Sequence, residues 1–225
     1  MTRAASSLLC SPQSHAVFGR RGRCTSWSTA PRQKRNAQSR RASCLAKSNG
    51  AELREELLTA IEGTDRGLAT SYEQQSAIFA VVDKLVEVGK GTVTTGEELS
   101  ATWKLAWTTE KEVLFLLKNA GWFGTKGGDV YQVVDVENKS LQNVITFPPE
   151  GAFVVTSSIQ VASDQRVRFK FNKARLDLPD NKKIPFPPYG EGWFQSVYMD
   201  DYVRVAKDIR GDTLVVTREG APRAF

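Results

Sequence analysis

The spacing of apolar residues along this chain changes once, from a helical period to the alternation that is typical of β-strands. The first helical pattern comprises Leu53, Leu57, Leu58 and Ile61, with charged residues between them and Gly63 as a stop. Thr70-Ser71-Tyr72-Glu73 then has the form of a capping box, and apolar residues continue on one face as far as Gly89. These patterns predict two short α-helices over about residues 52–88, packed against the rest of the domain.

From Trp103 onward, apolar and polar residues alternate. Candidate strands, many of them separated by Gly, Pro and Asp turns, cover residues 103–107, 112–118, 130–136, 141–147, 152–161, 166–176, 193–199, 202–207 and 213–218. We therefore predict a mainly β fold, an antiparallel β-barrel over about residues 99–218, although a β-sandwich would accept the same strands. An eight-stranded barrel is just wide enough for side chains or one small ligand, which makes an apolar pocket physically possible.

The side chains on the predicted inward faces of the strands are candidates for binding an apolar ligand. Strand alternation assigns to this set Leu105, Trp107, Phe115, Val133, Ile145, Phe153, Phe169 and Phe171. The assignment depends on parity, because a slip of one residue moves a whole strand's side chains to the opposite face.

The strand that begins at residue 166 also has a basic outer face. Arg166, Arg168 and Lys170 alternate there with Val167, Phe169 and Phe171. One interpretation is a solvated face that keeps an exposed strand soluble. The other is a surface that docks on anionic lipid headgroups or on an acidic partner.

Two further residues are expected to meet where the barrel closes. Trp103 lies early in the first predicted strand and Arg218 late in the last, and these strands are neighbours in a closed barrel. We predict a cation–π contact between them as a barrel-closing pair. The alternative is two unrelated residues, one buried and one on the surface.

The first 47 residues differ in composition from the rest. They contain ten of the 31 basic residues, all three cysteines and the single histidine, whereas all 25 acidic residues lie from Glu52 onward. A segment rich in Arg and Ser, without acid and without a long apolar run, is typical of a transit peptide. We predict a disordered chloroplast transit peptide over residues 1–47 and a mature domain over residues 48–225. A basic arm that binds nucleic acid is the alternative.

Without this segment, the predicted mature domain has neither thiol nor imidazole. Catalytic triads, histidine bases and thiolate metal sites are then excluded, and we predict no catalysis, no metal and no cofactor. The mature domain carries 21 basic and 25 acidic residues, a poor balance for binding nucleic acid. The carboxylate pairs Asp200–Asp201 and Asp208–Asp212 are expected at turns.

Several segments resemble the plastid-lipid-associated proteins, or fibrillins, over roughly residues 53–218. Residues 99–109 match the family's opening pattern L-x-G-x-W-x-L-x-Y-T-S/T, except that Ala101 replaces Gly and Trp107 replaces Tyr. Residues 197–216 match the closing pattern Y-x-D-x-x-x-R-V-x-R/K-D-x-R-G-D-x-L-V, and segments 143–149 and 165–171 also fit. The segments 143–149 and 192–200 look most like the stromal subgroup linked to plastoquinone synthesis.

The resemblance implies a lipocalin-like barrel in the chloroplast, in the stroma or at plastoglobules or thylakoids. It also implies non-catalytic binding of an isoprenoid-type lipid, such as a prenyl diphosphate, quinone or carotenoid. The alternative is a scaffold on a membrane or lipid-droplet surface that binds and activates a prenyl-lipid biosynthetic enzyme, such as a polyprenyl diphosphate synthase. An open apolar cavity favours lipid binding and a filled interior favours the scaffold. Convergent carboxylates with perturbed pKa values would favour an enzyme.

Overall fold

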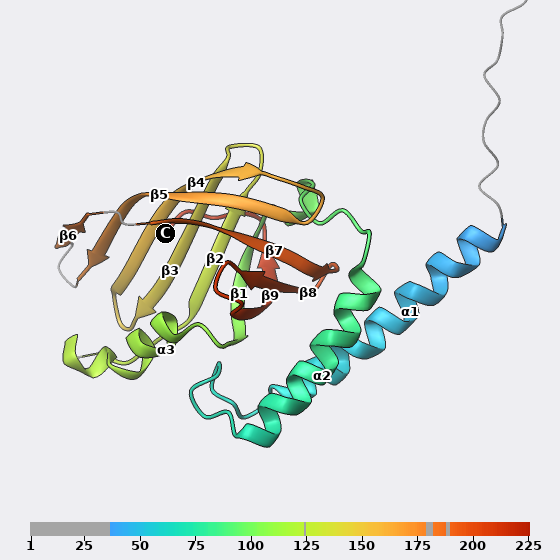
Figure 1. The fold of residues 1–225 in the computed structure, drawn as a ribbon. Helices are drawn as coiled ribbons and strands as arrows, with labels where there is room; N and C mark the ends of the chain where they lie inside the picture. Colours follow the sequence, from blue (N-terminus) through green and yellow to red (C-terminus); the bar gives the residue numbers. More distant parts are fainter. Residues whose placement is uncertain (1–36, 124, 179–181, 188–189) are drawn as a thin grey trace, which may run out of the picture. The chain divides into compact units, whose positions relative to one another are not determined.

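The described part of the chain begins with a pair of helices (Figure 1). The computed structural model describes residues 37–123, 125–178, 182–187 and 190–225. Helix α1 spans Ala37–Ala60 and α2 spans Tyr72–Gly89. Both predicted helices are present, but α1 begins well before residue 52, so residues 37–47 have helical backbone where we expected none. The first 36 residues of the predicted transit peptide lie outside the described residues.

A capping box starts α2, one residue later than the sequence pattern indicated. The Ser71 hydroxyl accepts a hydrogen bond from the Gln74 backbone N–H at 3.2 Å, and the Gln74 side chain accepts one from the Ser71 N–H at 3.1 Å. Thr70 is therefore not the cap. Its hydroxyl instead accepts a hydrogen bond from the Trp107 indole at 3.0 Å, which joins the start of α2 to the sheet.

Nine strands and one further α-helix follow among the described residues. The strands are β1 (Ala101–Thr108), β2 (Val130–Asp135), β3 (Ser140–Phe147), β4 (Gly151–Val161), β5 (Arg166–Asp177), β6 (Lys183–Phe186), β7 (Glu191–Met199), β8 (Val203–Asp208) and β9 (Thr213–Gly220). Helix α3 spans Lys111–Lys118, and 3₁₀ turns cover Glu97–Leu99 and Ala120–Phe123.

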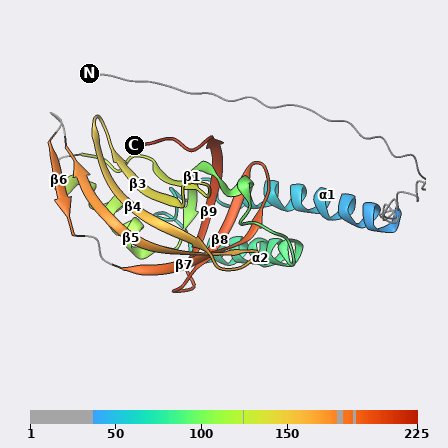
Figure 2. The same ribbon diagram turned by 90° about the horizontal axis from the view of Figure 1, so that it is seen from above.

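The strands form one antiparallel sheet that closes on itself. Its order is β4-β3-β2-β1-β9-β8-β7-β5-β6, and β5 also pairs with β4, so eight strands form a ring and β6 extends β5 at an edge. In both Figure 1 and Figure 2, β6 lies on the side away from α1 and α2. The prediction of a mainly β, antiparallel fold is confirmed.

Two local predictions were wrong. Residues 112–118 form helix α3 rather than a strand, because a short apolar run fits either period and Lys, Glu and Leu favour a helix. Strand β6 was missed because it contains Pro185, which removes a backbone donor. Proline is tolerated there since β6 is an edge strand.

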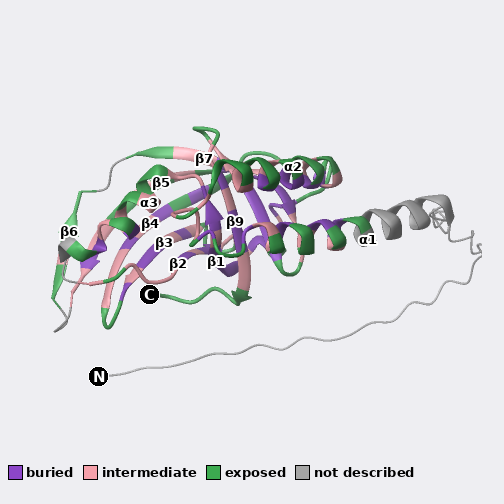
Figure 3. Ribbon diagram, turned by 90° about the horizontal axis from the view of Figure 1, so that it is seen from below, coloured by how far each residue is buried: buried purple, intermediate pink, exposed green. Residues whose placement is uncertain are grey.

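The buried residues form two main clusters, one inside the ring and one between the sheet and the helices α1 and α2. Figure 3 shows buried positions along the strands and on parts of both helices. The inner cluster fills part of the ring and includes Trp103, Leu141 and Phe194. In the outer cluster, Leu57 of α1 and Ile78, Val82 and Leu85 of α2 pack against strand residues such as Val205. The helices thus cover the outside of the sheet and leave the interior of the ring to the strands and α3.

Candidate functional site: an apolar cavity inside the strand ring

The ring encloses a cavity of about 350 Å³, at the small end of the range for small-molecule pockets. Apolar side chains from all eight ring strands line it, together with Val113 and Leu116 of α3. Glu112 and Arg210, both more than half exposed, also line it and form an ion pair. The cavity therefore opens to solvent between α3 and the turn that joins β8 to β9.

Five of the eight predicted lining residues border this cavity: Leu105, Ile145, Phe153, Phe169 and Phe171. The rings of Phe169 and Phe171 stack with their centroids 5.2 Å apart. Opposite them, a Cβ atom on Gly192 would lie 2.9 Å from the Phe169 ring, so a glycine is needed for this close approach. The parity that the sequence assigned to β5 is therefore the one in the structure.

The prediction that Trp107, Phe115 and Val133 point inward was wrong. The register between β1 and β9 shifts between Leu105 and Trp107, and this irregularity turns Trp107 to the outer face, where it meets Phe79 edge-on at 5.8 Å. Phe115 lies on α3 and is 54% exposed. Val133 lies between Gln132, which lines the cavity, and Val134, which belongs to the inner cluster with Val130, and so it lies on the outer face of β2.

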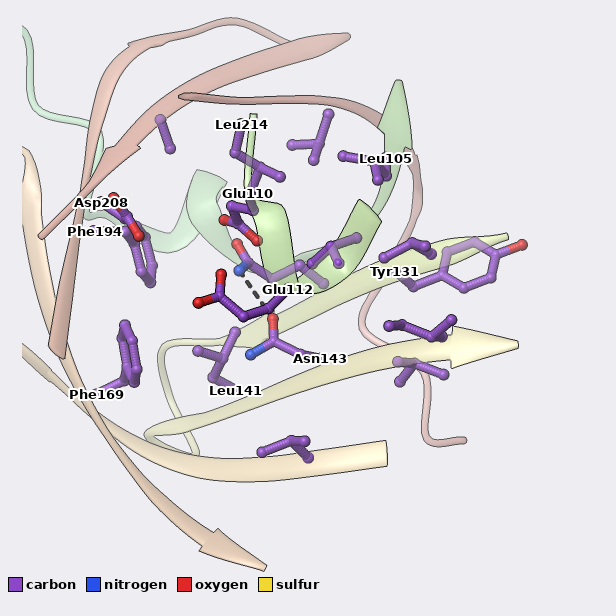
Figure 4. Close-up of a pocket in the computed structure, with 18 of the residues that line it drawn as sticks. Leu105, Glu110, Glu112, Tyr131, Leu141, Asn143, Phe169, Phe194, Asp208 and Leu214 are labelled. Atoms are coloured by element: carbon purple, nitrogen blue, oxygen red, sulfur yellow. Dashed lines mark hydrogen bonds between the residues drawn. The ribbon is translucent and has the colours of Figure 1, made fainter. Parts of the chain in front are cut away.

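Acidic side chains gather at the cavity mouth (Figure 4). Glu110, Glu112 and Asp208 line it, and Figure 4 shows the carboxyl group of Glu110 within the cavity. Burial, helped by the negative charges of Asp208, Asp212 and Glu112, raises the pKa of Glu110 to about 7, although Arg210 opposes the shift. Sequence reasoning missed Glu110, because nothing in its local pattern indicates that it faces a cavity.

The cavity wall also has one polar strip. Gln132 of β2 donates from Nε2 to Oδ1 of Asn143 on β3 at 3.1 Å, and both residues line the cavity. The Oε1 atom of Gln132 accepts a hydrogen bond from Nη2 of Arg204, which is fully buried on β8 behind this strip. Sequence analysis did not single out Arg204, although it lies within the closing family pattern.

The predicted pair of Trp103 and Arg218 lies in contact. The guanidinium carbon of Arg218 is 4.3 Å from the Trp103 ring centroid, across the β1–β9 pairing. Arg218 also donates hydrogen bonds to the carbonyl groups of Glu98 and Asp201. Burial lowers the pKa of Arg218, and the nearby carboxylates of Asp201, Asp200 and Glu98 oppose that shift.

The three basic residues on the outer face of β5 differ in exposure and in their contacts. Arg168 and Lys170 are exposed, whereas Arg166 stacks over the Trp193 ring at 4.0 Å and donates to the Gln195 side chain at 3.0 Å. Arg166 therefore also has a structural role, and the exposed charges of the stripe are those of Arg168 and Lys170.

The carboxylate pairs noted in the sequence mainly serve turns. Oδ1 of Asp200 accepts hydrogen bonds from the backbone of Tyr202 and Val203, and Oδ1 of Asp208 accepts them from Arg210 and Asp212. Within the described residues, there is no cluster of three or more possible metal ligands. No helix among them has the length and apolar character needed to cross a bilayer.

Ring and cavity together define an antiparallel β protein with an apolar interior. The family model PAP_fibrillin matches residues 51–217, and the chain belongs to the plastid-lipid-associated protein (fibrillin) family. The chain is 50% identical to the "Probable plastid-lipid-associated protein 11, chloroplastic" of Arabidopsis thaliana, with 79% of this chain and 85% of that protein covered. No solved structure matches it significantly.

More distant relatives have other names. The chain is 25% identical to the "Chromoplast-specific carotenoid-associated protein, chromoplastic" of Cucumis sativus and 22% identical to the "Light-induced protein, chloroplastic" of Solanum tuberosum. In both alignments, 76% of this chain and 68% of the relative are covered. These chloroplastic and chromoplastic names confirm the predicted plastid location.

Proposed function

We propose that this protein is a lipocalin-like barrel that binds an isoprenoid-type lipid in the plastid without covalent chemistry. The main supporting observation is the open cavity, since a filled interior would have favoured the scaffold alternative. Its apolar wall and few polar groups match the general character of small-molecule sites. The carotenoid-associated name of the cucumber relative is consistent with a ligand of this class.

The cavity volume limits how such a ligand binds. A cavity of about 350 Å³ is at the small end of the range for small-molecule sites. We therefore propose that it holds one end of a long isoprenoid, while the rest extends through the mouth beside α3. Leu105, Ile145, Phe153, Phe169 and Phe171 would contact the enclosed end.

Lipid retention in a pair of variants on β5 tests the proposal. Phe169→Asp places a charge inside the cavity, whereas Lys170→Asp places the same side chain on the exposed face next to it. We expect mass spectrometry to find co-purified lipid with the wild type and Lys170→Asp, and none with Phe169→Asp. Ala206→Leu narrows the cavity without adding a charge and should also reduce lipid content. Equal lipid in all four folded proteins would refute binding in this cavity.

A catalytic alternative has one observation in its favour, the raised pKa of Glu110 within the cavity. A glycosidase-type site needs a second carboxylate held across from the first. Asp208 instead caps the β8–β9 turn, and Asp212 accepts a hydrogen bond from the Thr109 hydroxyl at 2.8 Å. We therefore retain the non-catalytic proposal. The link to plastoquinone synthesis and a polyprenyl diphosphate synthase partner stay predictions that the relatives' names do not support.

A further inference from the structure

Arg204 is a buried cation that forms no ion pair with any described residue. Its side chain is 0% exposed, and burial lowers its pKa, although the negative charge of Glu110 opposes this shift. Among the described residues it donates hydrogen bonds only to neutral oxygens, Oγ of Ser196 at 3.4 Å and Oε1 of Gln132. Among the ion pairs of the described residues, none includes Arg204, and its buried Nε atom has no hydrogen-bond partner there.

Aromatic rings offset only part of the cost of burying this charge. The guanidinium carbon lies 5.2 Å from the centroids of both Trp103 and Phe194. Cation–π contacts are favourable, but buried charges in proteins are as a rule paired with an opposite charge. Arg204 therefore has unused capacity to bind an anion through Nε and, if Gln132 turns, through Nη2.

This cation lies beside the inner end of the cavity. Gln132, Phe194 and Ala206 all line the cavity, and Arg204 is two residues from Ala206 on the same face of β8. Figure 4 shows the hydrogen bond that joins the amide of Asn143 to its neighbour on the cavity wall. This strip is the polar part of the wall nearest to Arg204, and a shift of the Gln132 side chain would expose the guanidinium to a ligand.

The charges along the cavity favour one orientation for an anionic ligand. Asp208 and Glu112 are at the mouth, and Asp208 is four residues of β8, or roughly 13 Å, from Arg204. The Glu110 carboxyl reaches into the cavity, and its charge acts on Arg204. Like charges repel an anion held at the mouth, whereas the guanidinium attracts one at the inner end. An anionic group would therefore bind deep in the ring, with its apolar chain directed toward the mouth.

We propose that the cavity selects single-chain amphiphiles with a carboxylate or phosphate head, which binds Arg204 and Gln132. This inference rests on the proposed lipid-binding function and adds the chemical class and orientation of the ligand. Arg204 and Gln132 would be specificity-determining residues. Neutral isoprenoids such as carotenes would bind less tightly, because they bring no anion that can pair with the guanidinium.

Matched ligand pairs test the inference with the purified full-length chain after lipid extraction. The carboxylate pair is oleate with oleyl alcohol, and the phosphate pair is geranylgeranyl phosphate with geranylgeraniol. Titrations at about pH 8, where both heads are ionised, should give at least about tenfold tighter binding for the anion of one or both pairs. The pair with the larger ratio shows which head the site prefers.

Two variants assign the preference to Arg204. Arg204→Met should bring the anion and the alcohol to similar affinity, and the matched control Arg218→Met, on the same indole ring, should keep the preference. Gln132→Leu should weaken the preference for the anion, and this variant replaces Arg204→Met in the test if Arg204→Met does not fold. Equal affinity for acid and alcohol in the wild type would overturn the inference but leave lipid binding intact. Absence of binding by all four probes would instead refute the proposed function.

Discussion

The Arg218 guanidinium lies over the Trp103 indole, 4.3 Å from the ring centroid, where the first and last strands of the ring pair with each other. The same side chain donates to the carbonyl oxygens of Glu98 at 2.6 Å and Asp201 at 3.0 Å. Arg218 thus joins β9 to the 3₁₀ turn before β1 and to the loop before β8. The ring is closed here by side chains as well as by backbone hydrogen bonds.

Replacing Arg218 should therefore destabilise the fold. Arg218→Met removes a cation–π contact and two hydrogen bonds, so we expect a loss of about 2 kcal/mol in the free energy of unfolding. Urea denaturation measures this loss. Arg168→Met, on the exposed face of β5, is the control and should change stability little. Equal unfolding midpoints for the two variants would contradict the structural role of Arg218.

Replacing Trp107 should lower the stability of the fold but leave the affinity for the ligand unchanged. The indole contacts Phe79 and donates to Thr70 on the helix side of the sheet, so Trp107→Ala should cost about 3–5 kcal/mol. Ligand affinity per folded molecule should stay unchanged. Leu105→Ala, two residues away but in the cavity wall, should lower both stability and affinity. Loss of affinity in a folded Trp107→Ala variant would show that the outward placement is incorrect.

Glu110 should make stability fall as pH rises toward neutrality. Its pKa is raised from 4.5 to about 7 in the folded state, so the folded protein binds the proton more tightly than the unfolded chain. Protonated Glu110 contributes its full stabilisation to the folded state below pH 4.5. This contribution, at most about 3 kcal/mol in the free energy of unfolding, is lost as the pH rises through 7. Burial is the main cause of this shift, and the negative charges of Asp208, Asp212 and Glu112 add to it, whereas Arg210 opposes it.

Glu110→Gln tests that linkage, because glutamine is neutral at every pH. The variant should be more stable than the wild type at pH 8 and should lose most of the slope between pH 4.5 and 7. The test is to measure the unfolding midpoint of each protein across this pH range. Glu62→Gln, on the exposed turn after α1, is the control. An unchanged slope would mean that Glu110 ionises normally.

The exposed charges of β5 should affect binding to anionic surfaces only. Each basic residue near an anionic membrane adds about 1 kcal/mol, and salt screens this attraction. The double variant of Arg168→Gln and Lys170→Gln should keep its fold and cavity but bind anionic liposomes more weakly at low salt. Adding Arg166→Gln should also lower stability, because Arg166 stacks on Trp193. Salt-independent binding that is identical in wild type and double variant would leave the stripe as a solvated face.

The N-terminal segment should direct import into plastids. Because residues 1–47 contain ten basic and no acidic residues, a fluorescent protein fused to them should enter chloroplasts. Sequencing the N-terminus of the organelle form should locate the cleavage site, which we place near residues 42–48. Recovery of an intact Met1 from chloroplasts would contradict the prediction.

Features that depend on local patterns could be predicted from the amino-acid sequence. Alternation on residues 166–171 gave the correct parity of β5, because one face is apolar and the other basic over six residues. Likewise, the helical spacing of Leu53, Leu57 and Ile61 predicted the buried face of α1 and of the turn that follows it, since all three residues belong to the outer cluster. The Trp103–Arg218 contact also followed from sequence, since ring closure pairs the first strand with the last.

The side chains that meet inside the ring could not be predicted in this way, because they come from strands far apart in the sequence. An irregularity between Leu105 and Trp107 turns Trp107 to the outer face. No local pattern marks it, because Trp103, Leu105 and Trp107 alternate regularly with the residues between them. The charge of Arg204 and the raised pKa of Glu110 depend on burial by strands that are far apart in sequence. Local periodicity shows only which face of a helix or strand is apolar. The cavity and the charges in it depend on how eight strands come together in the ring.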